Sequence, residues 1–211
     1  MDSKEKENSQ AGRSARLVVV SGLPRSGTSM AMRMLEAGGV PIVTDRLRAA
    51  DEDNPNGYYE LERVKRLGKE TDYSWLNEAQ GKAIKIVSHL IMNLPCQLRY
   101  KIVFLNRAVD EVVASQNKML ARRGEKWDAS RDGRVAALFE QHLREVKAWM
   151  ESQLDVEVLY LNYGEVVANP EVEAKRLSRF IGGDLDWKNM SAAVDPGLYR
   201  NRSGKHAGAA V

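Results

Sequence analysis

The residues best suited to chemistry in this 211-residue chain lie in one short loop, Gly22 to Ser29. The loop reads Gly-Leu-Pro-Arg-Ser-Gly-Thr-Ser, and its one cation is Arg25. An apolar run, residues 17–20, precedes it, and a segment with helical spacing follows. A strand, a glycine-containing turn and a helix start in this order bring backbone N–H groups and the positive end of the helix dipole to one point. The loop therefore predicts an anion-binding site formed by Arg25, Ser26, Gly27, Thr28 and Ser29.

What the loop lacks indicates which anion it binds. The spacing Gly22-x4-Gly27 matches the frame of the P-loop, but Thr28 stands where the phosphate-binding lysine belongs. The candidate strands that should end in a magnesium-binding acid end in Asn106 and Asn162. Both features argue against ATP chemistry. They favour a sulfuryl group, which carries less charge than a terminal phosphoryl group and which arginine and backbone N–H groups can handle without a metal.

A second segment adds another anion-binding pattern. The predicted strand 101–105 is followed by Arg107, and Ser115 lies eight residues further along, on the next predicted helix. An arginine binds phosphate through charge-assisted, often bidentate hydrogen bonds, and a serine contributes a hydroxyl. Both side chains can therefore contact a phosphate group.

Together these segments resemble the 5′-phosphosulfate loop and the 3′-phosphate segment of sulfotransferases that use 3′-phosphoadenosine 5′-phosphosulfate (PAPS). The resemblance covers roughly residues 16–204, and arginine in the loop is similar to the tyrosylprotein and bacterial branches. It implies that the loop holds the 5′-phosphosulfate and that Arg107 and Ser115 anchor the 3′-phosphate.

The same resemblance extends to two residues late in the chain. Tyr163 matches a tyrosine near the adenine, although Gly164 replaces the acidic residue expected beside it. Arg202, in Arg-Ser-Gly, resembles the arginine that closes over the 3′-phosphate, and Arg200 is an equal candidate.

Sulfuryl transfer to an alcohol requires a base for the hydroxyl proton, and the sequence offers two. His89, in Val-Ser-His-Leu, resembles the base segment of aryl sulfotransferases, although Val87 stands in the place of that segment's lysine and Lys85 lies two residues earlier. Glu60, in Asn-Gly-Tyr-Tyr-Glu, resembles a segment of bacterial sulfotransferases. We expect catalysis to use Arg25 with either Glu60 or His89, with a slight preference for Glu60.

Strand-like and helix-like patterns alternate along the chain. This alternation predicts an α/β fold, a P-loop-like three-layer sandwich with a mostly parallel central sheet flanked by helices. Ligands bind beyond the carboxyl ends of such strands, where the first glycine loop lies. The expected strands are 16–21, 40–43, 83–87, 101–105 and 157–161; the expected helices are 26–37, 61–67, 109–120, 132–152 and one that begins at Pro170 with Asn169 as its N-cap.

Composition limits the remaining possibilities. We expect a disordered tail, residues 1–15, and a single domain, residues 16–211. One cysteine excludes an internal disulfide framework and, with no apolar run long enough for a bilayer, favours the cytoplasm. A net charge of +3 without a basic stripe argues against nucleic acid as a partner.

The expected protein is a sulfotransferase that uses PAPS, releases 3′,5′-ADP, needs no metal, and modifies a small molecule or a protein side chain. A P-loop metabolite or nucleotide kinase and a non-catalytic anion-binding module are the alternatives.

Overall fold

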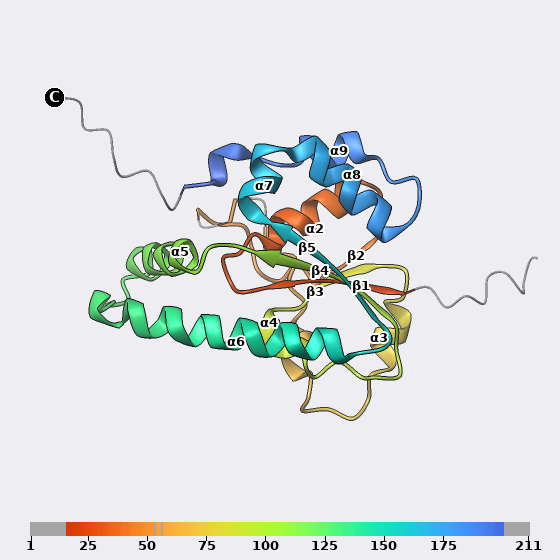
Figure 1. Ribbon diagram of the computed structural model, residues 1–211, viewed down its shortest axis with the longest axis horizontal. Helices are drawn as coiled ribbons and strands as arrows, with labels where there is room; N and C mark the ends of the chain where they lie inside the picture. Colours follow the sequence, from red (N-terminus) through yellow and green to blue (C-terminus); the bar gives the residue numbers. More distant parts are fainter. Residues whose placement is uncertain (1–15, 53, 56, 201–211) are drawn as a thin grey trace, which may run out of the picture.

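The computed structural model describes residues 16–52, 54–55 and 57–200. Within these ranges a five-stranded sheet has the order β2-β3-β1-β4-β5, and every neighbouring pair is parallel (Figure 1). The predicted α/β fold with a parallel sheet flanked by helices is therefore confirmed. The strands are β1 (Leu17–Gly22), β2 (Ile42–Val43), β3 (Ala83–Lys85), β4 (Tyr100–Asn106) and β5 (Val156–Asn162).

Helices cover both faces of this sheet (Figure 1). The α-helices are α2 (Thr28–Ala37), α3 (Ser74–Glu78), α4 (Ser88–Ile91), α5 (Val109–Arg122), α6 (Asp132–Ser152), α7 (Tyr163–Ala168), α8 (Pro170–Ile181) and α9 (Trp187–Ala192). Short 3₁₀ turns are η1 (Glu62–Arg66), η2 (Ala129–Arg131) and η3 (Pro196–Leu198).

The central strand β1 is buried along its whole length and divides the core into two clusters. Val18 and Val20 point to the face covered by α2, α7, α8 and α9. Leu17 and Val19 point to the opposite face, where α3, α4 and α6 pack. Because successive side chains of a strand alternate between faces, a run of apolar residues is what a strand buried on both sides needs.

Several local expectations differ from the structure. The strand expected over 40–43 has only two residues, because Pro41 lacks the N–H that a ladder requires. Asn169 does precede Pro170, but its side chain donates to Glu165 Oε2 at 3.2 Å and does not cap α8. The helices α3, α4, α7 and α9 were not predicted, because four to six residues are too short to show a helical period.

The topology determines where a ligand meets the protein. The strands β3, β1 and β4 are neighbours, so the segments after their carboxyl ends meet at one edge of the sheet. The helices α5 and α6 extend beyond this edge (Figure 1). None of the helices within the described ranges is long and apolar enough to cross a membrane.

Candidate anion-binding and transfer site

The loop between β1 and α2 turns tightly, with two residues in the left-handed region of backbone space. Gly27 is the N-cap of α2, with a left-handed φ of +103°, and Arg25 also has a positive φ, of +73°. A Cβ added to Gly27 would lie 2.4 Å from the ring of Tyr163. The loop therefore packs against that ring, and the first N–H groups of α2 lie at the cavity described below, where an anion can accept from them.

The two predicted anion-binding segments are in direct contact. Arg25 Nε donates to Ser115 Oγ at 3.1 Å, and Arg107 Nη1 donates to the carbonyl oxygen of Arg25 at 3.0 Å. The first bond joins residues that are 90 positions apart in the chain, and the second joins residues that are 82 positions apart. The two segments therefore form one site.

A buried ion pair holds Arg107 in place. Arg107 Nε lies 2.9 Å from Glu111 Oε2, and the two side chains are 7% and 4% exposed. Tyr199 donates from its hydroxyl to the other carboxylate oxygen of Glu111 at 2.9 Å. The guanidinium carbon lies 4.5 Å from the centroid of the Tyr163 ring. A salt bridge and an aromatic face together fix the plane of the guanidinium, which bidentate phosphate binding requires.

The opposite wall carries Glu60 between two cations. Arg48 Nη1 donates to Glu60 Oε1 at 3.1 Å, and Lys85 Nζ lies 3.7 Å from the same oxygen. Arg48 also stacks its guanidinium 3.3 Å from the centroid of the Tyr58 ring. The Glu60 side chain is 35% exposed, so it is both anchored and open to a substrate.

Lys85 is the site residue that sequence reasoning missed. It is the last residue of β3, its side chain is 6% exposed, and it donates to Ser29 Oγ at 3.4 Å and to the carbonyl oxygen of Tyr58. Burial lowers the pKa of Lys85 to about 8, against the opposing effect of Glu60. The sequence shows Lys85 near the end of a predicted strand, but the pairing of that strand with β1, which brings Lys85 to the site, comes from the sheet order.

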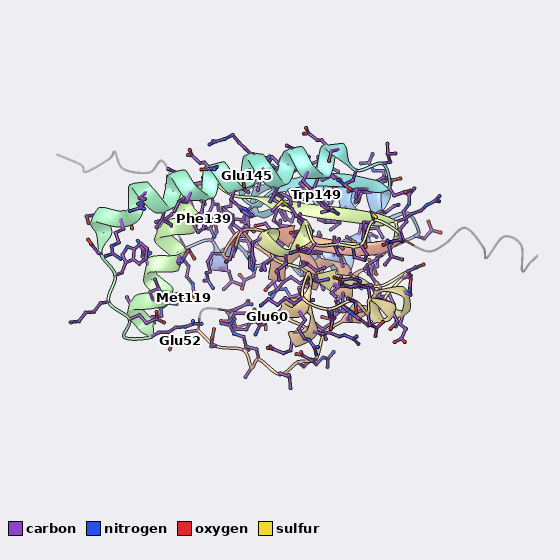
Figure 2. All side chains as sticks on the ribbon, turned by 90° about the horizontal axis from the view of Figure 1, so that it is seen from below. Glu52, Glu60, Met119, Phe139, Glu145 and Trp149 are labelled. Carbon is purple, nitrogen blue, oxygen red and sulfur yellow. The ribbon has the colours of Figure 1, made fainter. Side chains whose placement is uncertain are left out.

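These residues surround a cavity of about 480 Å³ at the carboxyl edge of the sheet. Figure 2 shows Glu60 on the body of the domain and Met119 and Phe139 on the two projecting helices, and all three line this cavity. Of the predicted site residues, these line it: Arg25, Gly27, Thr28, Ser29, Glu60, Arg107, Ser115 and Tyr163.

The structure does not bring every predicted residue to the cavity wall. His89 lies exposed on α4 and is not among the lining residues, and Ser26 is buried with its hydroxyl unpaired among the described atoms. Arg202 lies outside the described residues. Arg200 lines the cavity, and its Nη1 donates to the carbonyl oxygen of Glu52 at 3.2 Å.

The loop that follows β2 contacts the glycine loop at the same carboxyl edge of the sheet. Asn54 Nδ2 donates to Ser29 Oγ at 3.0 Å, and the Tyr58 hydroxyl donates to Asp51 Oδ1 at 2.6 Å. Ser29 thus receives hydrogen bonds from both Asn54 and Lys85.

In the part of the chain that the structure describes, no cluster of three His, Cys, Asp or Glu side chains is placed to hold a metal ion.

The fold and the site define a class of protein. A parallel sheet, a glycine loop leading into α2, and arginines gathered at the carboxyl edge of the sheet are features of P-loop-like α/β proteins that bind anionic groups at that edge.

The sequence matches the model of the sulfotransferase domain over residues 16–204, and the chain belongs to this family. It is therefore a transferase of the kind that moves sulfuryl groups, and a kinase function has weaker support. No curated protein matches it.

Solved structures show the same fold at low sequence identity. The sulfotransferase domain from the curacin biosynthetic pathway superposes with a TM-score of 0.50 at 14% identity, over 89% of this chain and 90% of that one. Sulfotransferase STF9 from Mycobacterium avium superposes with a TM-score of 0.50 at 14% identity, over 90% of this chain and 69% of that one.

Proposed function

We propose that the protein transfers a sulfuryl group from PAPS to a hydroxyl or amine of an acceptor and that it works in the cytoplasm, where its single cysteine stays reduced. The observation that carries the proposal is the joining of Arg25, Ser115 and Arg107 in one cavity. Two arginines from separate segments suit a ligand with anionic groups at two places, which a nucleoside 3′-phosphate 5′-phosphosulfate has.

The residues present fit such a donor. The N-terminus of α2, with the hydroxyls of Thr28 and Ser29, suits the 5′-phosphosulfate, and the oriented guanidinium of Arg107 with Ser115 suits the 3′-phosphate. The Tyr163 ring packs against Gly27 of the glycine loop, and Arg200 is placed to contribute a further cation. When bound, the donor supplies an activated sulfuryl group.

Glu60 acts as the base. It accepts the proton of the acceptor hydroxyl as that oxygen bonds to sulfur, while the electron pair of the broken sulfur–oxygen bond goes to the 5′-phosphate. Arg25, the α2 N-terminus and Lys85 stabilise the charge that develops on the sulfuryl oxygens and the leaving phosphate. We choose Glu60 over His89 because Glu60 lines the cavity and His89 does not.

Calorimetry separates this function from its alternatives. The protein should bind 3′,5′-ADP more tightly than ATP with magnesium, and it should transfer label from ³⁵S-PAPS to an acceptor. Tighter binding of ATP with magnesium would indicate a kinase. Binding of 3′,5′-ADP without transfer to any acceptor of a broad hydroxyl and amine set would indicate a non-catalytic anion-binding module.

A pair of variants tests the base. Glu60→Gln should lower kcat about 10²- to 10⁴-fold, because a positioned base contributes that much to proton transfer. His89→Asn is the matched control and should leave kcat within about twofold, since His89 lies outside the cavity wall. A large loss in His89→Asn with little loss in Glu60→Gln would reverse the assignment. Binding of 3′,5′-ADP should be similar in both variants.

A further inference from the structure

The two carboxylate oxygens of Glu60 have different surroundings. Arg48 Nη1 donates to Oε1 at 3.1 Å, and Lys85 Nζ lies 3.7 Å from the same oxygen. Among the described residues, none donates a hydrogen bond to Oε2. The side chain lines the cavity and is 35% exposed, so a ligand hydroxyl can reach it. The lone pairs of Oε2 are therefore available to accept a proton.

Of the two cations beside Glu60, Arg48 is the one that fixes its position. The 3.7 Å between Lys85 Nζ and Oε1 exceeds the length of a hydrogen bond. The ammonium of Lys85 has three N–H groups, and it already donates to Ser29 Oγ at 3.4 Å and to the carbonyl oxygen of Tyr58. The hydrogen bond that orients the carboxylate thus comes from Arg48.

Arg48 is itself held by a buried aromatic ring. Its guanidinium carbon lies 3.3 Å from the centroid of the Tyr58 ring, and Tyr58 is 6% exposed. The Tyr58 hydroxyl donates to both carboxylate oxygens of Asp51, at 2.6 and 2.7 Å. Burial and then this hydrogen bond raise the pKa of Tyr58 to about 12, so the hydroxyl keeps its proton at neutral pH. The ring that carries Arg48 is therefore fixed at both ends.

The stability of the fold does not explain this arrangement. The side chains of Arg48 and Glu60 are 37% and 35% exposed, and an ion pair so open to water contributes about 0–1 kcal/mol. A guanidinium that stacks on a ring while it donates from its edge has a fixed plane, which an ammonium does not have. Such a geometry directs the atom to which it donates. Both side chains line the cavity, so the directed atom belongs to the site.

We propose that Arg48 is a positioning residue, which holds Oε1 of Glu60 so that Oε2 faces the acceptor and takes its proton. The proposal rests on the proposed function, in which Glu60 is the base. As the acceptor oxygen bonds to sulfur, its proton passes to Oε2, and the electron pair of the broken sulfur–oxygen bond goes to the 5′-phosphate. Without Arg48 the carboxylate rotates, and Oε2 is in place for fewer turnovers.

The test uses water as the acceptor and measures release of ³⁵S-sulfate from saturating ³⁵S-PAPS. R48Q should lower kcat about tenfold or more, because a small displacement of a reacting group is costly. The Kd of 3′,5′-ADP, measured by calorimetry, should stay within about twofold. A general loosening of the loop would weaken this binding as well, since Asn54 of the same loop donates to Ser29.

A double variant shows whether Arg48 acts through Glu60. The kcat of R48Q/E60Q should equal that of E60Q within about twofold, because a residue that only positions the base has no effect once the base is gone. The matched control is R46Q. Arg46 lies two residues before Arg48, its side chain is 81% exposed, and it does not line the cavity. This variant should keep kcat within about twofold of the wild type.

The outcomes separate the two proposals. An unchanged kcat in R48Q, a loss of similar size in R46Q, or a further loss of about fivefold or more when R48Q is added to E60Q would overturn the inference about Arg48 alone. If the wild type does not bind 3′,5′-ADP, the donor assignment fails. If it binds 3′,5′-ADP and releases no sulfate, the assignment of Glu60 as base and the role of Arg48 fail together.

Discussion

At the scale of single residues, the charge of Lys85 is the most sensitive feature of the site. Its ammonium is buried at the end of β3, where burial lowers its pKa to about 8 and Glu60 partly opposes that effect. The lysine is thus mostly charged at pH 7 and loses its charge as the pH rises above 8. Transfer activity that depends on this cation should fall over the same range.

The buried lysine also makes stability depend on pH. Its folded pKa of about 8 lies below the ordinary 10.5, so the cost of burying the charge is fully present below pH 8, falls between the two values and vanishes above the higher one. This cost is roughly 3 kcal/mol. Lys85→Met removes this cost. The unfolding free energy of the wild type should therefore rise relative to that of the variant between pH 7 and pH 10.

Urea unfolding at pH 7, 8.5 and 10 measures this difference. The exposed Lys82, three residues earlier in the chain, supplies the control, since Lys82→Met should give a difference that hardly changes with pH. A difference for Lys85→Met that stays constant over the same range would contradict the assigned pKa.

At the scale of elements, the glycine loop and α7 support each other. Gly27 begins α2, and the Tyr163 ring that begins α7 occupies the space beside its Cα. The ring also meets Tyr199 edge to face, with centroids 4.9 Å apart, and lies against the guanidinium of Arg107. The position of the loop thus depends on a helix more than a hundred residues later in the chain.

Gly27→Ala should damage both stability and ligand binding. The new methyl group meets the Tyr163 ring, and the positive φ adds strain, so we expect a loss of about 2 kcal/mol or more in unfolding free energy. Binding of 3′,5′-ADP should weaken about tenfold or more, because the loop must move. Denaturant unfolding and calorimetry give the two values.

Gly39→Ala is the matched control for this change. Gly39 has a similar φ of +93°, but an added Cβ would meet no described atom within 4 Å. The variant should lose about 1 kcal/mol of unfolding free energy, because only the backbone strain applies. It should bind 3′,5′-ADP as the wild type does. Equal effects of the two alanines would show that contact with Tyr163 is unimportant.

At the scale of the whole molecule, the site joins segments that lie far apart in the chain. Its residues come from the loop after β1, the end of β3, the segment after β4, α5 and the last described residues of the chain. A ligand that bridges these elements binds only when the whole sheet is assembled. Binding should therefore stabilise the domain against global unfolding and not only order the loops.

The expected gain can be calculated from linkage. At one hundred times its Kd, 3′,5′-ADP should raise the unfolding free energy by about 2.7 kcal/mol, visible as a higher Tm. Arg107→Gln should lose most of this ligand-dependent rise. Arg99→Gln should retain it, since Arg99 lies in an exposed ion pair with Asp155 at the other end of β4. A rise that persists in Arg107→Gln would exclude Arg107 from the binding site.

The sequence alone determined the features that depend on neighbouring residues. The order of β1, glycine loop and α2 is encoded in an apolar run, two glycines and a helical period, and the bounds of α6 follow from its own spacing. The placement of Arg107 directly after β4 and of Ser115 on α5 follows from the same local patterns, while their role in phosphate binding stays a prediction from the family resemblance.

The tertiary structure alone decided which distant side chains meet. The pairing of Val20 with Lys85 in the β1–β3 register brings Lys85, and not His89, to the cavity. The Arg107–Glu111–Tyr199 network likewise depends on packing. Such contacts arise from burial and hydrogen bonding between segments far apart in the chain, and no local pattern of residues specifies them.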